Sequence, residues 1–80
     1  MYYVYILRSL KVLNETYVGF STDFERRLAE HNLGKSIHTN KFKPWKIDVL
    51  VSFENRKKAE AFEKYLKTGS GRAFAKRHFI

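Results

Sequence analysis

Residues 2–20 read YYVYILRSLKVLNETYVGF and contain the two segments that predict the central β-hairpin of the domain. Residues 2–8 are rich in β-branched and aromatic side chains and contain neither glycine nor proline, which predicts a strand. A polar turn ends at Asn14 and Glu15, and residues 16–20 form a second predicted strand. The connection is too short for a parallel crossover, so the two strands are expected to form an antiparallel hairpin.

Two tyrosines of this hairpin are expected to lie on the same face. Side chains alternate along a strand, so Tyr5 and Tyr17 can sit side by side with their hydroxyls converging near one edge. Gly19 lies inside the second strand, where a glycine is costly unless another group must approach the backbone closely. The simpler interpretation is that both tyrosines are ordinary sheet residues.

A helix is predicted to follow the hairpin. Thr22 and Glu25 have the spacing of a capping box, so the helix should begin at Asp23, and Gly34 is a natural stop. The side chains that recur at helical spacing, and that should face the core, are Phe24, Leu28 and His31.

The rest of the chain predicts a loop, a strand and two helices. Residues 35–46 are expected to be a basic loop that contains the only proline, and residues 47–53 alternate as a third strand. A second helix is predicted over residues 56–67, and the Gly69-Ser70-Gly71 segment should break it before a short final helix. The order ββαβαα predicts a single α+β domain over residues 1–80, in which a three-stranded antiparallel sheet is flanked by helices.

Size and composition exclude several classes of protein. A chain of 80 residues allows one small domain and no large enclosed pocket. There is no cysteine, which excludes disulfides, thiolate zinc sites and thiol nucleophiles. The apolar run at residues 2–7 is too short for a signal-peptide core or a membrane span, so we expect a cytoplasmic protein without a membrane partner.

The net charge of +8 is unevenly distributed. Residues 35–46 carry +4 without an acid, and residues 55–80 carry +6. Basic charge concentrated in this way, with aromatic residues between the cations, favours nucleic acid as the partner. The alternative is a solvated, lysine-rich surface. The side chains expected to contact nucleic acid are Lys35, Lys41, Lys43, Lys46, Arg72 and Lys76.

Three further side chains are unusual for purely structural residues. Arg27 and His31 are four residues apart on the first helix and border its apolar stripe. The simpler interpretation is that Arg27 forms a surface ion pair with Asp23 or Glu30. Glu63 lies on the apolar arc of the second long helix, where an ionised carboxylate is costly unless it is paired or binds a metal. Lys67, one turn later, could provide that pairing.

Four segments together resemble the GIY-YIG nuclease domain. Tyr3-Val4-Tyr5 and Tyr17-Val18-Gly19 look like its two-part motif, with Tyr3 in place of the first glycine and Val18 in place of an isoleucine. Residues 23–32, DFERRLAEHN, are similar to the first helix of the family, and residues 59–67, AEAFEKYLK, resemble its metal-binding helix. The resemblance covers nearly the whole chain, and is strongest to small stand-alone members related to the nuclease domain of the bacterial excision-repair incision subunit.

The resemblance implies a role for each unusual residue. It implies that the motif residues are Tyr5, Tyr17 and Gly19. It also implies that Arg27 is the catalytic arginine and that His31 is the helix histidine. Glu63 would then be the single protein ligand of one Mg²⁺ or Mn²⁺ ion. A tyrosine hydroxyl, provisionally that of Tyr5, would accept the proton of the attacking water. Tyr17 would position the water or the phosphate. His31 is an alternative base or a support for Tyr17. Phe20 stands where many relatives have a small or basic residue.

The expected function is that of a metal-dependent endonuclease that hydrolyses phosphodiester bonds in DNA, including branched or damaged DNA, in repair or processing. A non-catalytic nucleic-acid-binding module on the same scaffold is the main alternative, and a protein that contacts an acidic partner is a third. We expect a monomer or a weak homodimer. The sequence does not distinguish DNA from RNA.

Overall fold

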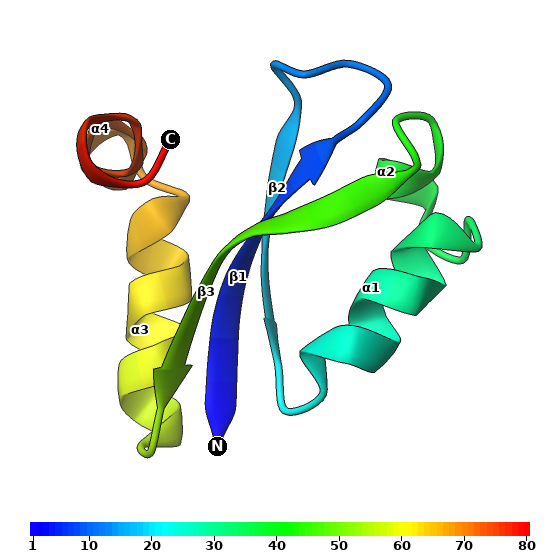
Figure 1. The fold of residues 1–80 in the computed structure, drawn as a ribbon. Coiled ribbons are helices and arrows are strands. Elements are labelled where there is room, and N and C mark those ends of the chain that lie inside the picture. The colour runs from blue at the N-terminus through cyan, green and yellow to red at the C-terminus, as the bar shows by residue number, and fades with distance from the viewer.

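The structure is a computed structural model that describes residues 1–80. Strands β1 (Tyr2–Ser9), β2 (Thr16–Ser21) and β3 (Trp45–Phe53) form one antiparallel sheet in the order β2-β1-β3. The helices are α1 (Phe24–Asn32), α2 (Ile37–Asn40), α3 (Arg56–Leu66) and α4 (Gly69–His78), and they lie on both sides of the sheet (Figure 1). The predicted α+β class and its ββαβαα order are confirmed, with the short helix α2 as an addition.

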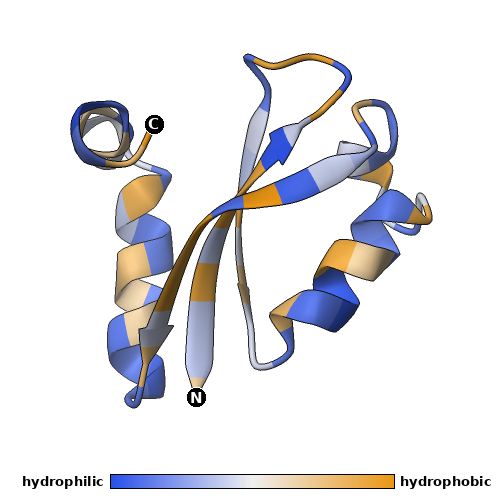
Figure 2. Cartoon of the chain, in the orientation of Figure 1, coloured by the Kyte–Doolittle hydropathy of each residue, from blue (hydrophilic) through white to orange (hydrophobic).

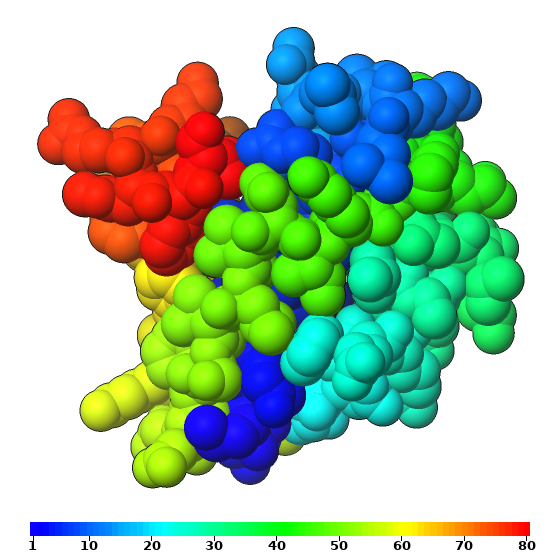
Figure 3. Space-filling model, in the orientation of Figure 1, coloured from blue at the N-terminus to red at the C-terminus, as the bar shows by residue number.

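The central strand β1 supplies the core on both faces of the sheet. Val4 and Ile6 pack with α3 and α4 on one face, whereas Tyr5 and Leu7 pack with Trp45 and α1 on the other. Figure 2 shows apolar residues on this central strand and polar residues over much of the helix surface. In the space-filling view of Figure 3, β3 lies between α4 on one side and α1 on the other.

The register of the sheet fixes which residues are neighbours. Tyr5 pairs with Gly19 across β1 and β2, and Leu7 pairs with Tyr17. A one-residue shift in register interrupts the pairing of β1 with β3 after Ile6, as in a β-bulge. The predicted hairpin is confirmed, and Tyr5, Tyr17 and Gly19 all belong to the face of the sheet that α1 covers.

The prediction of a continuous loop over residues 35–46 was wrong. A one-turn helix, α2, forms at Ile37–Asn40, and β3 already begins at Trp45. Tertiary contacts hold this segment in place, and in one of them the indole Nε1 of Trp45 donates to the carbonyl of Thr39. The side-chain amide of Asn32 donates to the backbone carbonyl of Trp45 and accepts from its backbone N–H. A four-residue helix has too little periodicity to be recognised in a sequence.

Two predicted helix boundaries also need correction. The N-cap of α1 is Asp23 rather than Thr22, because the Asp23 carboxylate accepts from the backbone N–H of Arg26. A break after the second predicted helix is present, but it lies at Lys67 and Thr68, and the Gly69-Ser70-Gly71 segment already belongs to α4, with Thr68 as its N-cap. Gly34 does follow α1 as predicted, with φ of 78°, a conformation that favours glycine. No helix has the length and apolar character that crossing a membrane would require.

Candidate active site

The Tyr5 ring lies directly across the backbone of Gly19. Tyr5 is only 2% exposed, and a Cβ atom placed on Gly19 would overlap the Tyr5 ring and its hydroxyl. The glycine is therefore required because an aromatic side chain covers it from the adjacent strand. The close approach expected from a glycine inside a strand is confirmed, and the approaching group is the neighbouring tyrosine.

The buried Tyr5 hydroxyl meets the guanidinium of Arg27 from helix α1. Burial raises the pKa of Tyr5, while hydrogen bonding and positive charge from Arg27 oppose that rise. Burial has the larger effect, so the phenol stays protonated at neutral pH. The Tyr17 hydroxyl and the Glu63 carboxylate make smaller contributions to the raised pKa of Tyr5.

A carboxylate holds Arg27 from the same helix. Arg27 Nη1 lies 2.5 Å from Glu30 Oε1, so the proposed ion pair with a neighbouring acid is present, and Glu30 rather than Asp23 provides it. This pair lowers the pKa of Glu30. The Arg27 side chain is still 36% exposed. A guanidinium has five N–H donors, so Glu30 leaves donors free to bind a phosphate.

Tyr17 contacts a fully buried histidine. The rings of Tyr17 and His31 lie 5.0 Å apart between centroids, and His31 is 0% exposed. His31 Nδ1 is 2.6 Å from the hydroxyl of Thr39, whereas His31 Nε2 has no hydrogen-bond partner. Burial and the charge of Arg27 lower the pKa of His31, so the imidazole is neutral at pH 7. These contacts fit a residue that holds Tyr17 better than one that exchanges protons with water.

Glu63 approaches the tyrosines from the opposite face of the sheet. It lies on α3, which packs on the side of Val4 and Ile6, and its side chain is 22% exposed. Because β2 is an edge strand, α3 and α1 can both present side chains near the same edge. The expected pairing of Glu63 with Lys67 is present, with 3.1 Å between the Lys67 ammonium and the carboxylate.

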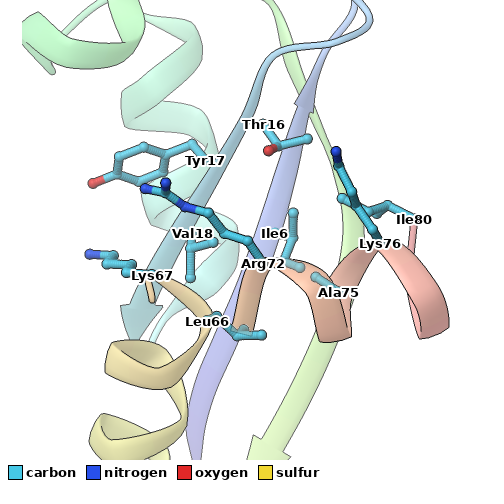
Figure 4. A pocket seen from close by; sticks show the side chains of 10 residues that line it. All are labelled: Ile6, Thr16, Tyr17, Val18, Leu66, Lys67, Arg72, Ala75, Lys76 and Ile80. Atoms are coloured by element: carbon cyan, nitrogen blue, oxygen red, sulfur yellow. The ribbon is translucent and has the colours of Figure 1, made fainter. Parts of the chain in front are cut away.

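An open cavity of about 440 Å³ adjoins Tyr17 at this edge. It lies between the hairpin and helices α3 and α4, and Figure 4 shows the Tyr17 ring on one side of it. The Tyr17 ring contacts His31, and Tyr17 is also one of the residues that line the cavity. The cations among the lining residues are Lys67, Arg72 and Lys76.

The basic side chains expected to bind nucleic acid form two groups. The first surrounds α2 and the start of β3, and the second lies on α4, beside the cavity. All of them are exposed: Lys35, Lys41, Lys43 and Lys46 in the first group, and Arg72 and Lys76 in the second. Only the second group adjoins Tyr17.

Three participants were not apparent as such from the sequence. Thr39 holds His31, Asn32 fastens the end of α1 to β3, and Glu30 was only one of two acids that could orient Arg27. No sequence signal marks Thr39, because its partner is eight residues away and its helix is a single turn.

One divalent ion is compatible with the residues present. The chain has no cluster of three or more histidine, cysteine, aspartate or glutamate side chains that could enclose a metal. Magnesium binds proteins through as few as one or two carboxylates, with waters and substrate phosphate completing its coordination. The partly exposed Glu63 carboxylate can supply one such protein ligand.

The sequence is similar to a known catalytic domain and to several known proteins. The model of the GIY-YIG catalytic domain matches residues 1–77. Over 68 residues, 82% of this chain, the sequence is 41% identical to UPF0213 protein YsiG of Lactococcus lactis subsp. lactis, and the match covers 62% of that protein. Over 67 residues, 79% of this chain, it is 42% identical to Structure-specific endonuclease subunit SLX1 of Malassezia globosa, covering 15% of that protein. Over 73 residues, 82% of this chain, the sequence is 40% identical to Structure-specific endonuclease subunit SLX1 of Candida dubliniensis, and the match covers 26% of that protein. The chain thus spans less than two thirds of the length of each relative.

Proposed function

The chain belongs to the GIY-YIG family, and on that premise we propose that it is a metal-dependent endonuclease that cleaves structured DNA, as in repair or processing. The observation that carries the proposal is the contact between the buried Tyr5 hydroxyl and the Arg27 guanidinium, with Tyr17 two residues from Gly19, the cross-strand partner of Tyr5. Tyr5, Tyr17, Arg27 and Glu63 come from four separate elements, and Arg27 and Glu63 also form ion pairs with Glu30 and Lys67. The SLX1 relatives are named as structure-specific endonuclease subunits, which supports DNA as the substrate.

Arg27 is proposed to bind the scissile phosphate. Glu30 fixes one of its nitrogens and Tyr5 restrains the guanidinium from the buried side, so the remaining N–H donors are oriented before substrate arrives. Donors fixed in advance stabilise charge that develops during the reaction without reorganisation. A lysine has no planar fork and could not replace this geometry.

We assign the contact with the attacking water to Tyr17 rather than to Tyr5. The raised pKa of Tyr5 keeps its hydroxyl protonated at neutral pH, and the residue is only 2% exposed, which weighs against its provisional role as a base. The Tyr17 ring reaches an open cavity, where substrate and water have access. His31 is proposed to hold that ring in place.

Glu63 would hold the metal ion. A bound magnesium or manganese ion would supply positive charge against the negative charge that develops on the leaving oxygen. The Lys67 side chain is 52% exposed, and a surface pair of this kind contributes about 0–1 kcal/mol, so Glu63 can exchange this partner for a metal at little cost.

The same ion pair favours a second candidate function. If Lys67 stays on Glu63, the domain would bind nucleic acid through its basic groups without cleaving it. Metal-dependent strand scission distinguishes the two functions, whereas binding at low salt is expected of both.

The test is cleavage of duplex, nicked, 5′-flap and single-stranded DNA, each with and without magnesium. We expect magnesium-dependent cleavage by the wild-type protein and its loss in Glu63→Ala. The matched control is Glu60→Ala, which removes a carboxylate from the same helix that is paired with Arg56 instead. If folded Glu63→Ala cleaves at the wild-type rate, Glu63 is not in the site. If the wild-type protein binds these DNAs at low salt but cleaves none of them, the non-catalytic nucleic-acid-binding function replaces the endonuclease proposal.

A further inference from the structure

The cavity beside Tyr17 has an apolar floor that the proposed cleavage reaction does not use. Its floor and walls are formed by Ile6, Val18, Leu66 and Ala75, which come from both hairpin strands and from α3 and α4. At about 440 Å³ it falls within the range of small-molecule sites, so one flat ring system has room in it. The Tyr17 ring offers a surface against which such a ring system can stack.

Positive charge flanks this apolar floor on two sides. Figure 4 shows Lys67 and Arg72 on the side of Tyr17, while Lys76 lies on the opposite side. No aspartate or glutamate lines the cavity. A nucleotide within a DNA strand has matching chemistry, since its base is flat and largely apolar on its faces and a phosphate lies on either side of it.

We propose that this cavity binds one unpaired nucleotide adjacent to the scissile phosphate. The inference rests on the proposed function, because Tyr17 is shared between the cavity and the candidate active site. A base inside an intact duplex is stacked and paired on both sides and must first be extruded, which costs a few kcal/mol. A base at a flap or branch point is already free, so the cavity makes the protein select DNA with an unpaired nucleotide at the junction.

Two pairs of variants separate this cavity from general charge and general folding effects. Val18→Trp fills the cavity from β2, and aromatic residues are well accepted in strands. Its control is Leu50→Trp on β3, the opposite edge strand, where the side chain is already 40% exposed. Arg72→Gln removes a cation from the cavity, and Arg77→Gln removes an equal charge from the same helix at a position that lines a different pocket.

The experiment measures binding in EDTA, so it does not depend on cleavage. The probes are a 5′-flap duplex and an intact duplex of equal length, with 2-aminopurine at the first unpaired flap position or at the equivalent paired position. We expect the wild-type protein to bind the flap about tenfold more tightly, as one stacked base would provide, and to change the 2-aminopurine fluorescence of the flap alone. Val18→Trp and Arg72→Gln should reduce that preference at least threefold, while Leu50→Trp and Arg77→Gln should retain it.

The outcomes distinguish the two proposals. Equal binding of flap and duplex by the wild-type protein, or an unchanged flap preference in both cavity variants, overturns the nucleotide site even if magnesium-dependent cleavage is present. A flap preference that is lost in both cavity variants supports the nucleotide site even if no cleavage is detected. Circular dichroism shows whether Val18→Trp is folded. If Val18→Trp is unfolded, Arg72→Gln still tests the cavity, because Arg72 is exposed and its replacement should not disturb the fold.

Discussion

Replacing Gly19 with alanine should disturb the candidate site without removing any of its functional groups. The added Cβ would overlap the ring and hydroxyl of Tyr5. The far end of a side chain can often move aside, but Tyr5 is 2% exposed and packed with Leu7 and Trp45. The ring must therefore either stay and strain the pairing of β1 with β2, or leave its place beside Arg27.

Two opposing effects set the change in the free energy of unfolding for Gly19→Ala. Introducing a methyl group into a well-packed region costs about 1–3 kcal/mol. Replacing glycine by alanine within a strand returns about 0.5–1 kcal/mol through the entropy of the unfolded chain. The difference between these ranges is about 0–2.5 kcal/mol, and their mid-values give a net loss in the free energy of unfolding of about 1.25 kcal/mol. For a domain of this size, that mid-value corresponds to a melting temperature lower by about 5–10 °C.

Thermal and urea unfolding followed by circular dichroism measures this loss, and cleavage of the flap substrate measures the displacement of Tyr5. A double-mutant cycle with Tyr5→Leu isolates the contact, because Gly19→Ala should cost less than about 0.5 kcal/mol once the ring is absent. The reasoning is refuted if Gly19→Ala is as stable and as active as the wild-type protein. It is also refuted if the cost is the same with and without the Tyr5 ring, since the strain would then arise elsewhere.

Three other perturbations have expected outcomes. Burial lowers the pKa of His31, so below about pH 6.5 the unfolded chain binds more protons than the folded protein. The free energy of unfolding should therefore fall as the pH drops from 7 to 5. Urea titrations of His31→Gln should show a weaker dependence on pH. Arg27→Lys should lower the cleavage rate by at least about tenfold while changing DNA affinity less than about threefold, and equal losses would make Arg27 a binding residue only. Gly71→Ala should destabilise the fold by about 1–3 kcal/mol because its Cβ would meet the Tyr65 carbonyl, whereas Gly69→Ala, with open space around it, should be neutral or stabilising in the same melting experiment.

Much of the candidate site could be predicted because its residues follow local rules. Alternation along a strand puts Tyr5 and Tyr17 on the same face, and helical spacing puts Arg27 beside His31. The same spacing places Lys67 within reach of Glu63, and that ion pair is present. Each of these placements depends only on residues within one element or one hairpin.

Other features could not be predicted, because residues that are distant in the chain decide them. The helix α2 forms where its Thr39 meets the His31 and Trp45 side chains, and its four residues carry no signal of their own. The bulge between β1 and β3 depends on how two strands, separated by the whole of α1 and α2, are aligned. The choice of Glu30 over Asp23 as the partner of Arg27 depends on the side-chain orientation in the packed helix.

The order of strands and helices, and the faces that their side chains occupy, could be predicted because backbone geometry repeats every two residues in a strand and about every 3.6 in a helix. The tertiary structure placed Glu63 on the opposite face of the sheet from α1, on a helix that contacts β2. It also decided that a cavity opens beside Tyr17 and that the Tyr5 ring covers Gly19. These outcomes depend on how two helical layers pack against one sheet, and no local repeat in the chain encodes that packing.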